Sequence, residues 1–142
     1  MSIALAEAEA AAARGEVPVG AVVARGNAAI ASAGNRTREF RDPTAHAEML
    51  AIRDAARLLS AERLDEADLY VTLEPCAMCA GAISFARIRR LYFGALDQKG
   101  GAVVSGVRFF GSPTCHHAPE VCSGSGEMKA VDLLKGFFRD RR

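Results

Sequence analysis

The sequence predicts an α/β fold in which a mixed β-sheet is flanked by helices. Short β-branched or apolar runs alternate with longer stretches of helical pattern, which is typical of layered α/β domains. The first two predicted strands are joined by a short turn and should pair antiparallel, whereas the later pair is separated by a helix. The 142 residues are the length of one domain, so we expect a single domain over residues 1–142.

The N-terminal part of the chain predicts a helix, a β-hairpin and a loop. Residues 3–14 are rich in alanine and are followed by Gly15, the residue type that most often ends a helix. Two apolar runs, 19–24 and 28–33, flank a Gly-Asn pair and predict a hairpin. Residues 34–44 are polar and predict a loop.

A second helix is predicted from about residue 44 to residue 59. Asp42 is a favourable N-cap residue, and Pro43 suits the first helical position because its fixed backbone angle matches the helix. Apolar residues then recur at helical spacing. The positions expected to face the core are Met49, Ile52, Ala56 and Leu59.

The C-terminal half predicts two strands and two helices. Residues 68–73 form a short apolar run that predicts a buried strand, and residues 77–87 have a helical pattern. Residues 90–94 predict another strand, and residues 127–141 predict a closing helix. The segment 100–126 is interrupted by glycine and proline and has no firm assignment.

Composition excludes several classes of protein. Half the residues are apolar and 25% are charged, which is ordinary for a globular chain and excludes a disordered one. No apolar run approaches the ~18 residues of a membrane helix, so no membrane partner is expected. The N-terminus lacks the basic start of a secretory signal, so a cytoplasmic location is expected. A net charge of +1 is small for a protein that coats nucleic acid.

Two short motifs carry the chemistry: His46-Ala47-Glu48 and Pro75-Cys76-Ala77-Met78-Cys79. Cys76 and Cys79 are spaced to share one face at the start of a helix, where the helix dipole favours thiolates. With His46 they make three nitrogen and sulfur donors, the types that zinc prefers. A redox-active cysteine pair is the alternative interpretation of the Cys-x-x-Cys motif.

The number of donors leaves open whether such a site is catalytic or structural. Catalytic zinc sites have three protein ligands and a water, whereas structural sites have four protein ligands. Glu48 lies about 200° around a helix from His46, so the two do not share a face, but Glu48 is free to lie beside a bound water. The candidates for a fourth ligand, or for a second metal site, are Cys115, His116, His117 and Cys122.

Jointly the motifs fit the zinc deaminase signature, His-x-Glu followed by Pro-Cys-x-x-Cys. Within the cytidine and deoxycytidylate deaminase superfamily, the chain resembles the bacterial tRNA-specific adenosine deaminases, which make inosine at the wobble position. Residues 105–122 resemble the α-proteobacterial versions of that family. The resembling stretches, which together cover nearly the whole chain, are 16–22, 34–36, 42–48, 70–76, 80–83 and 137–139.

The resemblance implies a three-layer α/β/α fold with a five-stranded mixed sheet. It also implies a homodimer that binds the anticodon stem-loop of a tRNA, with an arginine tRNA as the expected substrate. One zinc ion per subunit would be held by His46, Cys76 and Cys79, and Glu48 would move protons for a zinc-activated water that deaminates adenosine. The residues implied in substrate binding are Asn35, Val17, Ala47, Asp97, Phe138 and Arg139.

Other interpretations stay open for several of these residues. Asn35 and Asp97 also suit turns, and the basic residues 139–142 also suit a solvated tail. Leu96 departs from the family, in which many members have arginine. A deaminase of the same fold that acts on free guanine, cytosine or adenosine is the main alternative function. A zinc-stabilised binding module without turnover is another, and it would need a fourth protein ligand.

Overall fold

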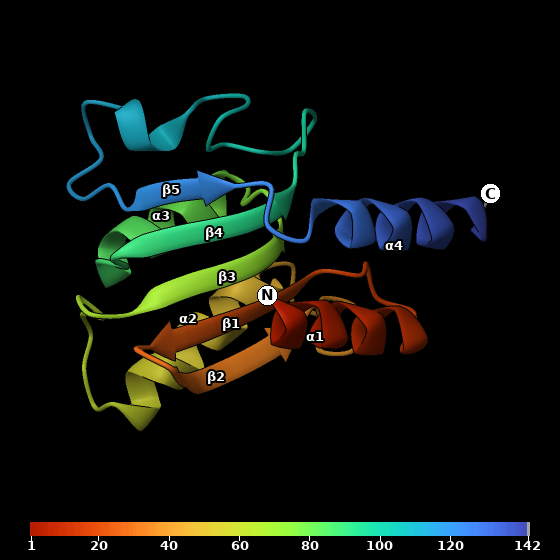
Figure 1. Ribbon diagram of the computed structural model, residues 1–142, viewed down its shortest axis with the longest axis horizontal. Coiled ribbons are helices and arrows are strands. Elements are labelled where there is room, and N and C mark those ends of the chain that lie inside the picture. The colour runs from red at the N-terminus through yellow and green to blue at the C-terminus, as the bar shows by residue number, and fades with distance from the viewer. Residues whose placement is uncertain (142) are drawn as a thin grey trace.

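Residues 1–141, the part of the chain that the computed structural model describes, form a five-stranded mixed sheet with helices on both faces (Figure 1). The strand order is β2-β1-β3-β4-β5. Strand β1 pairs antiparallel with β2 and β3, and β3, β4 and β5 run parallel. The predicted mixed sheet is confirmed. Its strands are β1 (Gly20–Arg25), β2 (Ala28–Gly34), β3 (Asp68–Leu73), β4 (Arg90–Ala95) and β5 (Glu120–Ser123).

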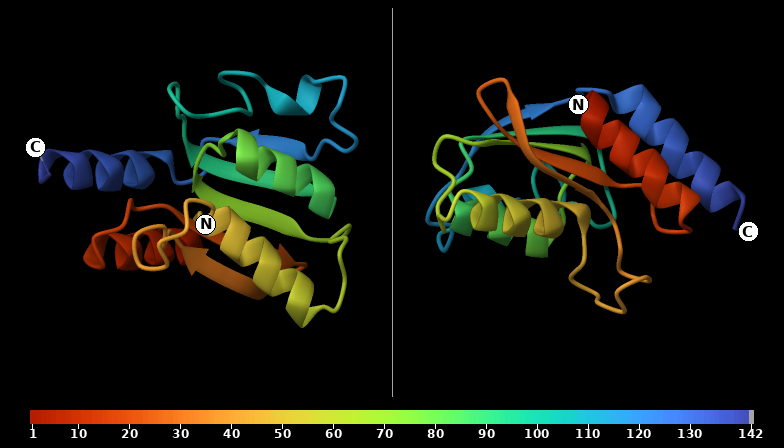
Figure 2. Two further views of the ribbon diagram at one scale, coloured as in Figure 1. Left: turned by 180° about the vertical axis from the view of Figure 1, so that it is seen from behind. Right: turned by 90° about the horizontal axis from the view of Figure 1, so that it is seen from below.

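The helices form the two outer layers of the predicted α/β/α arrangement. Helices α2 (Ala47–Leu58) and α3 (Ala77–Ala86) cover one face of the sheet (Figure 2). Helices α1 (Ser2–Ala13) and α4 (Glu127–Arg139) pack side by side on the other face. Within residues 1–141, no helix combines the length and apolar character needed to span a membrane.

The main core lies between the sheet and the α2–α3 layer. Leu69 and Val71 of β3 and Leu91 and Phe93 of β4 are fully buried there, because alternate residues of a strand point to the same face. Alanines of α2 pack against them and allow the helix to lie close to the sheet. The starts of α2 and α3 are thereby held next to each other, and both metal-motif segments lie at these starts.

The predicted start of the second helix at residue 44 is wrong. Asp42 forms a local turn instead, because the Thr44 backbone N–H and hydroxyl donate to its carboxylate at 2.8 and 2.7 Å. The helix begins at Ala47, whose N–H donates to the Asn35 side-chain oxygen at 2.8 Å. A residue twelve positions earlier in the chain therefore sets the start of α2.

The predicted core face of this helix is also partly wrong. Of the four positions expected to be buried only Ile52 is, while Met49, Ala56 and Leu59 are half-buried. Leu59 still packs against the core from its half-buried position, whereas Met49 and Ala56 are not part of the core cluster. Alanines face the sheet instead, because their small side chains permit close packing. The residues buried along α2 are Ala47, Glu48, Ala51, Ile52 and Ala55.

The unassigned segment 100–126 contains a short 3₁₀ helix, Phe109–Gly111, and the edge strand β5. Strand β5 has four residues, and none of them is fully buried. It therefore lacks the alternation of buried and exposed residues that identifies a strand from sequence. Pairing with β4 is what makes this segment a strand.

Gly20 is expected to be essential for the packing of α1 on the sheet. A Cβ atom at this position would lie 1.9 Å from the Ala4 backbone oxygen and 2.6 Å from the Ala8 nitrogen. Because both atoms belong to the backbone of α1, the whole helix would have to shift. We expect Gly20→Ala to lower the free energy of unfolding by about 3 kcal/mol. Urea denaturation measures this, with Gly111→Ala, which has open space around its Cβ position, as a near-neutral control.

Candidate metal centre and active site

The structure brings His46, Cys76 and Cys79 together at the adjoining starts of two helices. His46 is the N-cap residue of α2, Cys76 is the N-cap residue of α3, and Cys79 lies in the first turn of α3. Their ligand atoms all lie within 4.8 Å of one another. His46 Nδ1 is 3.7 Å from Cys76 Sγ and 3.6 Å from Cys79 Sγ. Among residues 1–141 this is the one group of three or more potential metal ligands.

The donor set fits a soft divalent metal ion with one open coordination position. One imidazole and two thiol groups are typical ligands of such an ion. The group contains three protein donors, so the fourth protein ligand of a structural site is missing from the described chain. A binding module built on a closed four-ligand site is therefore not supported.

The four candidates for a further ligand do not assemble into a metal site among residues 1–141. The Cys115 thiol donates to the His117 backbone oxygen at 3.1 Å. His117 Nε2 lies 2.8 Å from the Ile88 backbone oxygen. The bonds of His117 to Ser84 and Ile88 hold the 115–117 turn against α3 and the residues just before β4.

The two thiols of the cluster differ in their protonation. A hydrogen bond from Cys79, together with the nearby His46, lowers the pKa of Cys76 to about 4. The same interaction with Cys76, and its own burial, raises the pKa of Cys79. The interaction with Cys76 also raises the pKa of His46. The two thiols therefore differ in acidity, and a metal ion held by both would favour their thiolate forms, because only thiolates are strong ligands.

Glu48 lies beside this cluster on the buried side of α2. Its side chain is 4% exposed, and burial raises the pKa of its carboxyl group. It lies close enough to the Cys79 thiol for each group to change the pKa of the other. A buried carboxyl group with a raised pKa next to a metal site is suited to accept and return protons.

Asn35 and Ala47, both predicted to bind substrate, are hydrogen-bonded to each other. The Asn35 Oδ1 atom accepts the Ala47 N–H at 2.8 Å, so the side-chain amide caps the start of α2. The Asn35 N–H donates to the Val19 oxygen, and its carbonyl accepts from Arg14 Nη2, both at 3.1 Å. With its oxygen occupied, the Asn35 side chain presents its NH₂ group as a donor.

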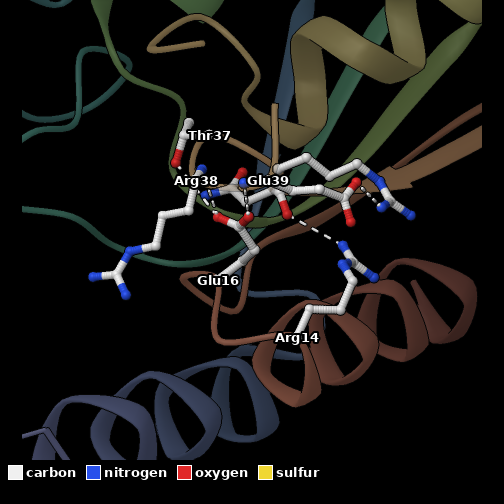
Figure 3. Close-up of polar contacts among 7 residues, drawn as sticks. Arg14, Glu16, Thr37, Arg38 and Glu39 are labelled. Carbon is white, nitrogen blue, oxygen red and sulfur yellow. Dashed lines mark hydrogen bonds and ion pairs between the residues drawn. The ribbon is translucent and has the colours of Figure 1, made fainter. Parts of the chain in front are cut away.

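A buried carboxylate that sequence reasoning did not single out holds the next loop. Glu16 is 2% exposed and accepts the backbone N–H groups of Arg38 and Glu39 at 3.1 and 2.8 Å. Figure 3 shows this carboxylate surrounded by the loop, with Arg14 reaching up from the end of α1. The sequence did contain a sign of this role, since a glutamate stands directly before the apolar run that forms β1. A carboxylate buried in such a place needs hydrogen-bond donors around it. Glu16 therefore anchors the loop that follows Asn35.

Four of the predicted substrate-binding residues line one open groove of about 950 Å³. They come from the loop before β1, the loop after β4 and the end of α4, which the fold places side by side. Several basic residues share the walls, which favours an anionic ligand. The metal cluster, Asn35 and Ala47 are not among the lining residues. The walls are Val17, Leu73, Leu96, Asp97, Lys99, Leu134, Lys135, Phe138, Arg139 and Arg141.

Asp97 and the C-terminal aromatics have definite structural roles. The Asp97 carboxylate accepts the N–H groups of Lys99 and Gly100 at 3.2 and 2.9 Å, so it forms the turn that was its alternative role. Phe137 is buried, whereas Phe138 is 49% exposed at the groove. Of the basic tail, Arg139 and Arg141 line the groove, and residue 142 lies outside the described part of the chain.

Comparison with known proteins identifies relatives over the full length of the chain. The profile of the MafB19-like deaminase family matches residues 1–142. A tRNA-specific adenosine deaminase of Agrobacterium fabrum is 62% identical over all of this chain and 93% of its own length. A solved structure from a study of A-to-I editing by tRNA:A34 deaminases superposes with a TM-score of 0.93. It is 63% identical and covers 94% of this chain and 97% of its own.

A solved guanine deaminase of Bacillus subtilis is a more distant neighbour. It is 41% identical, has a TM-score of 0.65, and covers 67% of this chain and 61% of its own. Both kinds of relative share the fold. The tRNA-specific enzymes match this chain over a greater length and at higher identity.

Proposed function

Because this chain belongs to the deaminase family, and within it to the tRNA-specific adenosine deaminases, we propose that it converts the wobble adenosine of a tRNA anticodon loop to inosine. The reaction adds water to the adenine ring and releases ammonia. The observation that carries the proposal is a buried carboxyl group beside a three-donor metal cluster, in a chain 62% identical to such an enzyme over its whole length. An arginine tRNA and a cytoplasmic location are part of the proposal.

We propose zinc as the metal, one ion per subunit, with His46, Cys76 and Cys79 as its ligands. Zinc, when bound, acts as a Lewis acid that allows a water molecule to lose its proton near pH 7. Glu48 would accept one proton of the water and pass it to the ring nitrogen, and would then carry the second water proton, from the new hydroxyl group on C6, to the departing amino group. Its burial supports this role, because a carboxyl group shielded from solvent exchanges protons with the substrate rather than with bulk water.

The base is proposed to be held by the segment before β1, by Asn35 and by the start of α2. The Asn35 NH₂ group is available to donate to the adenine ring, since its oxygen is held by Ala47. Val17 would pack against the base, and the Ala47 backbone would border it. An anticodon base can enter such a site because it is splayed out of a single-stranded loop.

The groove is proposed to bind the nucleotides that flank the target base. Phe138 exposes half of its surface there, and an exposed aromatic ring can stack on a base. Arg139, together with the lysines of the groove, is placed to contact phosphates. Asp97 also lines the groove, where it would border the substrate strand.

We propose that the protein is a homodimer and that an apolar strip on α3 contributes to its interface. Phe85 is 78% exposed, and Met78 and Ala82 lie on the same face of the helix. We expect Phe85→Asp to yield a monomer, because an unpaired charge would be buried in the interface. Light scattering after size exclusion measures this. Met128→Asp, on the opposite layer and 81% exposed, is the control that stays dimeric.

The proposed function is tested with an anticodon stem-loop that carries a wobble adenosine. The purified zinc-loaded protein is offered this RNA and, separately, free adenosine, cytosine and guanine. We expect inosine from the stem-loop and no turnover of the free compounds. Xanthine from guanine with an unchanged stem-loop would instead show a free-base deaminase and would overturn the proposal.

A further inference from the structure

We propose that Glu74 is a positioning residue for RNA binding: its buried carboxylate holds the segment 96–105, which forms one wall of the groove. The inference rests on the proposed function and deepens it. Glu74 is the last residue before the Pro-Cys-x-x-Cys motif and follows β3 directly. It is 2% exposed, so its negative charge must be compensated by protein groups.

Both oxygens of Glu74 are fully occupied by one segment of the chain. Oε1 accepts the Asp97 N–H at 3.0 Å and the Ser105 hydroxyl at 2.9 Å. Oε2 accepts the N–H groups of Val103, Val104 and Ser105 at 3.1, 2.9 and 2.9 Å. Five donors on one carboxylate fix both ends of the segment to a single point. Hydrogen bonds to a charged acceptor are about twice as strong as neutral ones.

The packing around the carboxylate shows that the segment fits it closely. A Cβ atom at Gly101 would lie 2.5 Å from the Glu74 Cδ atom and 2.5 Å from the Asp97 oxygen. Glycine is therefore required where the chain passes over the carboxylate. The Ala102 N–H donates to the Pro75 oxygen at 2.9 Å, and the Glu74 N–H donates to the Ala95 oxygen at 2.8 Å. The segment is thus bound to the residues that immediately precede Cys76.

This anchoring determines one side of the groove. Leu96, Asp97 and Lys99 of the anchored segment are lining residues. The other lining residues come from Val17, from Leu73 and from α4 and the residues after it, and Val17 and α4 contact RNA in the proposed function. Glu74 itself is absent from the lining, and its oxygens have no lone pair left for a substrate. Its effect on RNA must therefore pass through the segment that it holds.

The test is Glu74→Gln, with Glu62→Gln as the control because Glu62 is exposed. Glutamine keeps the size of the side chain but turns an NH₂ group toward N–H donors. Two quantities are measured on folded, zinc-loaded protein: hydrogen exchange of the amides of 97 and 103–105, and steady-state kinetics on the stem-loop. We expect faster exchange confined to these amides, with KM raised about tenfold and kcat within about twofold of wild type. Ser105→Ala, which loses one of the five bonds, should shift both readouts less and in the same direction.

Three outcomes would overturn the inference. Unchanged exchange at 97 and 103–105 would show that Glu74 does not hold the segment. Altered exchange with an unchanged KM would show that the segment does not position RNA. A lower kcat at constant KM, with faster exchange along the whole chain, would indicate a general folding role. If wild-type protein does not act on the stem-loop, the proposed function fails, and the exchange experiment still decides whether Glu74 anchors this segment.

Discussion

Glu48→Ala is expected to abolish deamination while the protein stays folded and keeps its metal. The carboxyl group is the one proton-transfer group proposed at the site, and loss of such a group slows catalysis by about 10²- to 10⁴-fold. The three metal ligands are untouched, and alanine is well tolerated in the helix that carries this position. Inosine formation from the stem-loop under single-turnover conditions measures the loss, and elemental analysis measures zinc.

Glu48→Gln separates proton transfer from packing in this experiment. Glutamine fills the same buried space but cannot accept a proton from water, so we expect the same loss of turnover. A thermal melt checks that both variants stay folded. Turnover at the wild-type rate in either variant would remove Glu48 from the mechanism. Loss of zinc together with activity would instead make Glu48 a determinant of metal binding.

Cys79→Ser is expected to lose both metal and much of the stability that the metal provides. Cys79 lies in the first turn of α3 and is completely buried. The serine hydroxyl group that replaces its thiol is a poor ligand for a soft metal ion. Metal affinity is part of the folding free energy when the ligands come from separate segments. Zinc should therefore raise the melting temperature of the wild-type protein by several degrees, and a chelator should reverse this. Neither should affect Cys79→Ser.

The matched control is Cys122→Ser, because Cys122 lies on the edge strand β5, outside the metal cluster. This variant should bind one zinc ion per subunit and respond to a chelator as the wild type does. Stoichiometric zinc and normal activity in Cys79→Ser would show that Cys79 is not a ligand. Loss of zinc in Cys122→Ser would show that the 115–122 segment contributes to the metal site after all.

The proposed chemistry depends on the junction of two helix starts. A single arrangement places His46 and Cys76 at N-caps, where unpaired backbone N–H groups favour negative ligands. The Asn35 side chain uses its oxygen to cap α2, and its NH₂ group is the one proposed to contact the base. Glu16 and Glu74 hold the loops that follow Asn35 and β4. The site is therefore built on rigid helix ends with loops tied down by buried carboxylates.

Most secondary structure and the candidate metal cluster could be predicted from the sequence. The helix at the N-terminus, the first hairpin and the strand 68–73 follow from local patterns of alanine, β-branched residues and glycine. The grouping of His46, Cys76 and Cys79 could be predicted because metal coordination allows few residue types and narrow spacings, and the structure brings the three together. Each of these patterns and each of the two motifs occupies a few neighbouring residues, so a short window of sequence contains it.

The tertiary structure alone decided the features that depend on distant partners. The start of α2 follows from the bond between Asn35 and Ala47, and its buried face follows from how closely alanines let it approach the sheet. Strand β5 forms because β4 offers an unpaired edge. The groove walls meet because the loop after β4 is tied to Glu74 while α4 packs beside α1. Hydrogen bonds and packing between segments far apart in the chain leave no periodic pattern in either segment, and only the folded chain reveals them.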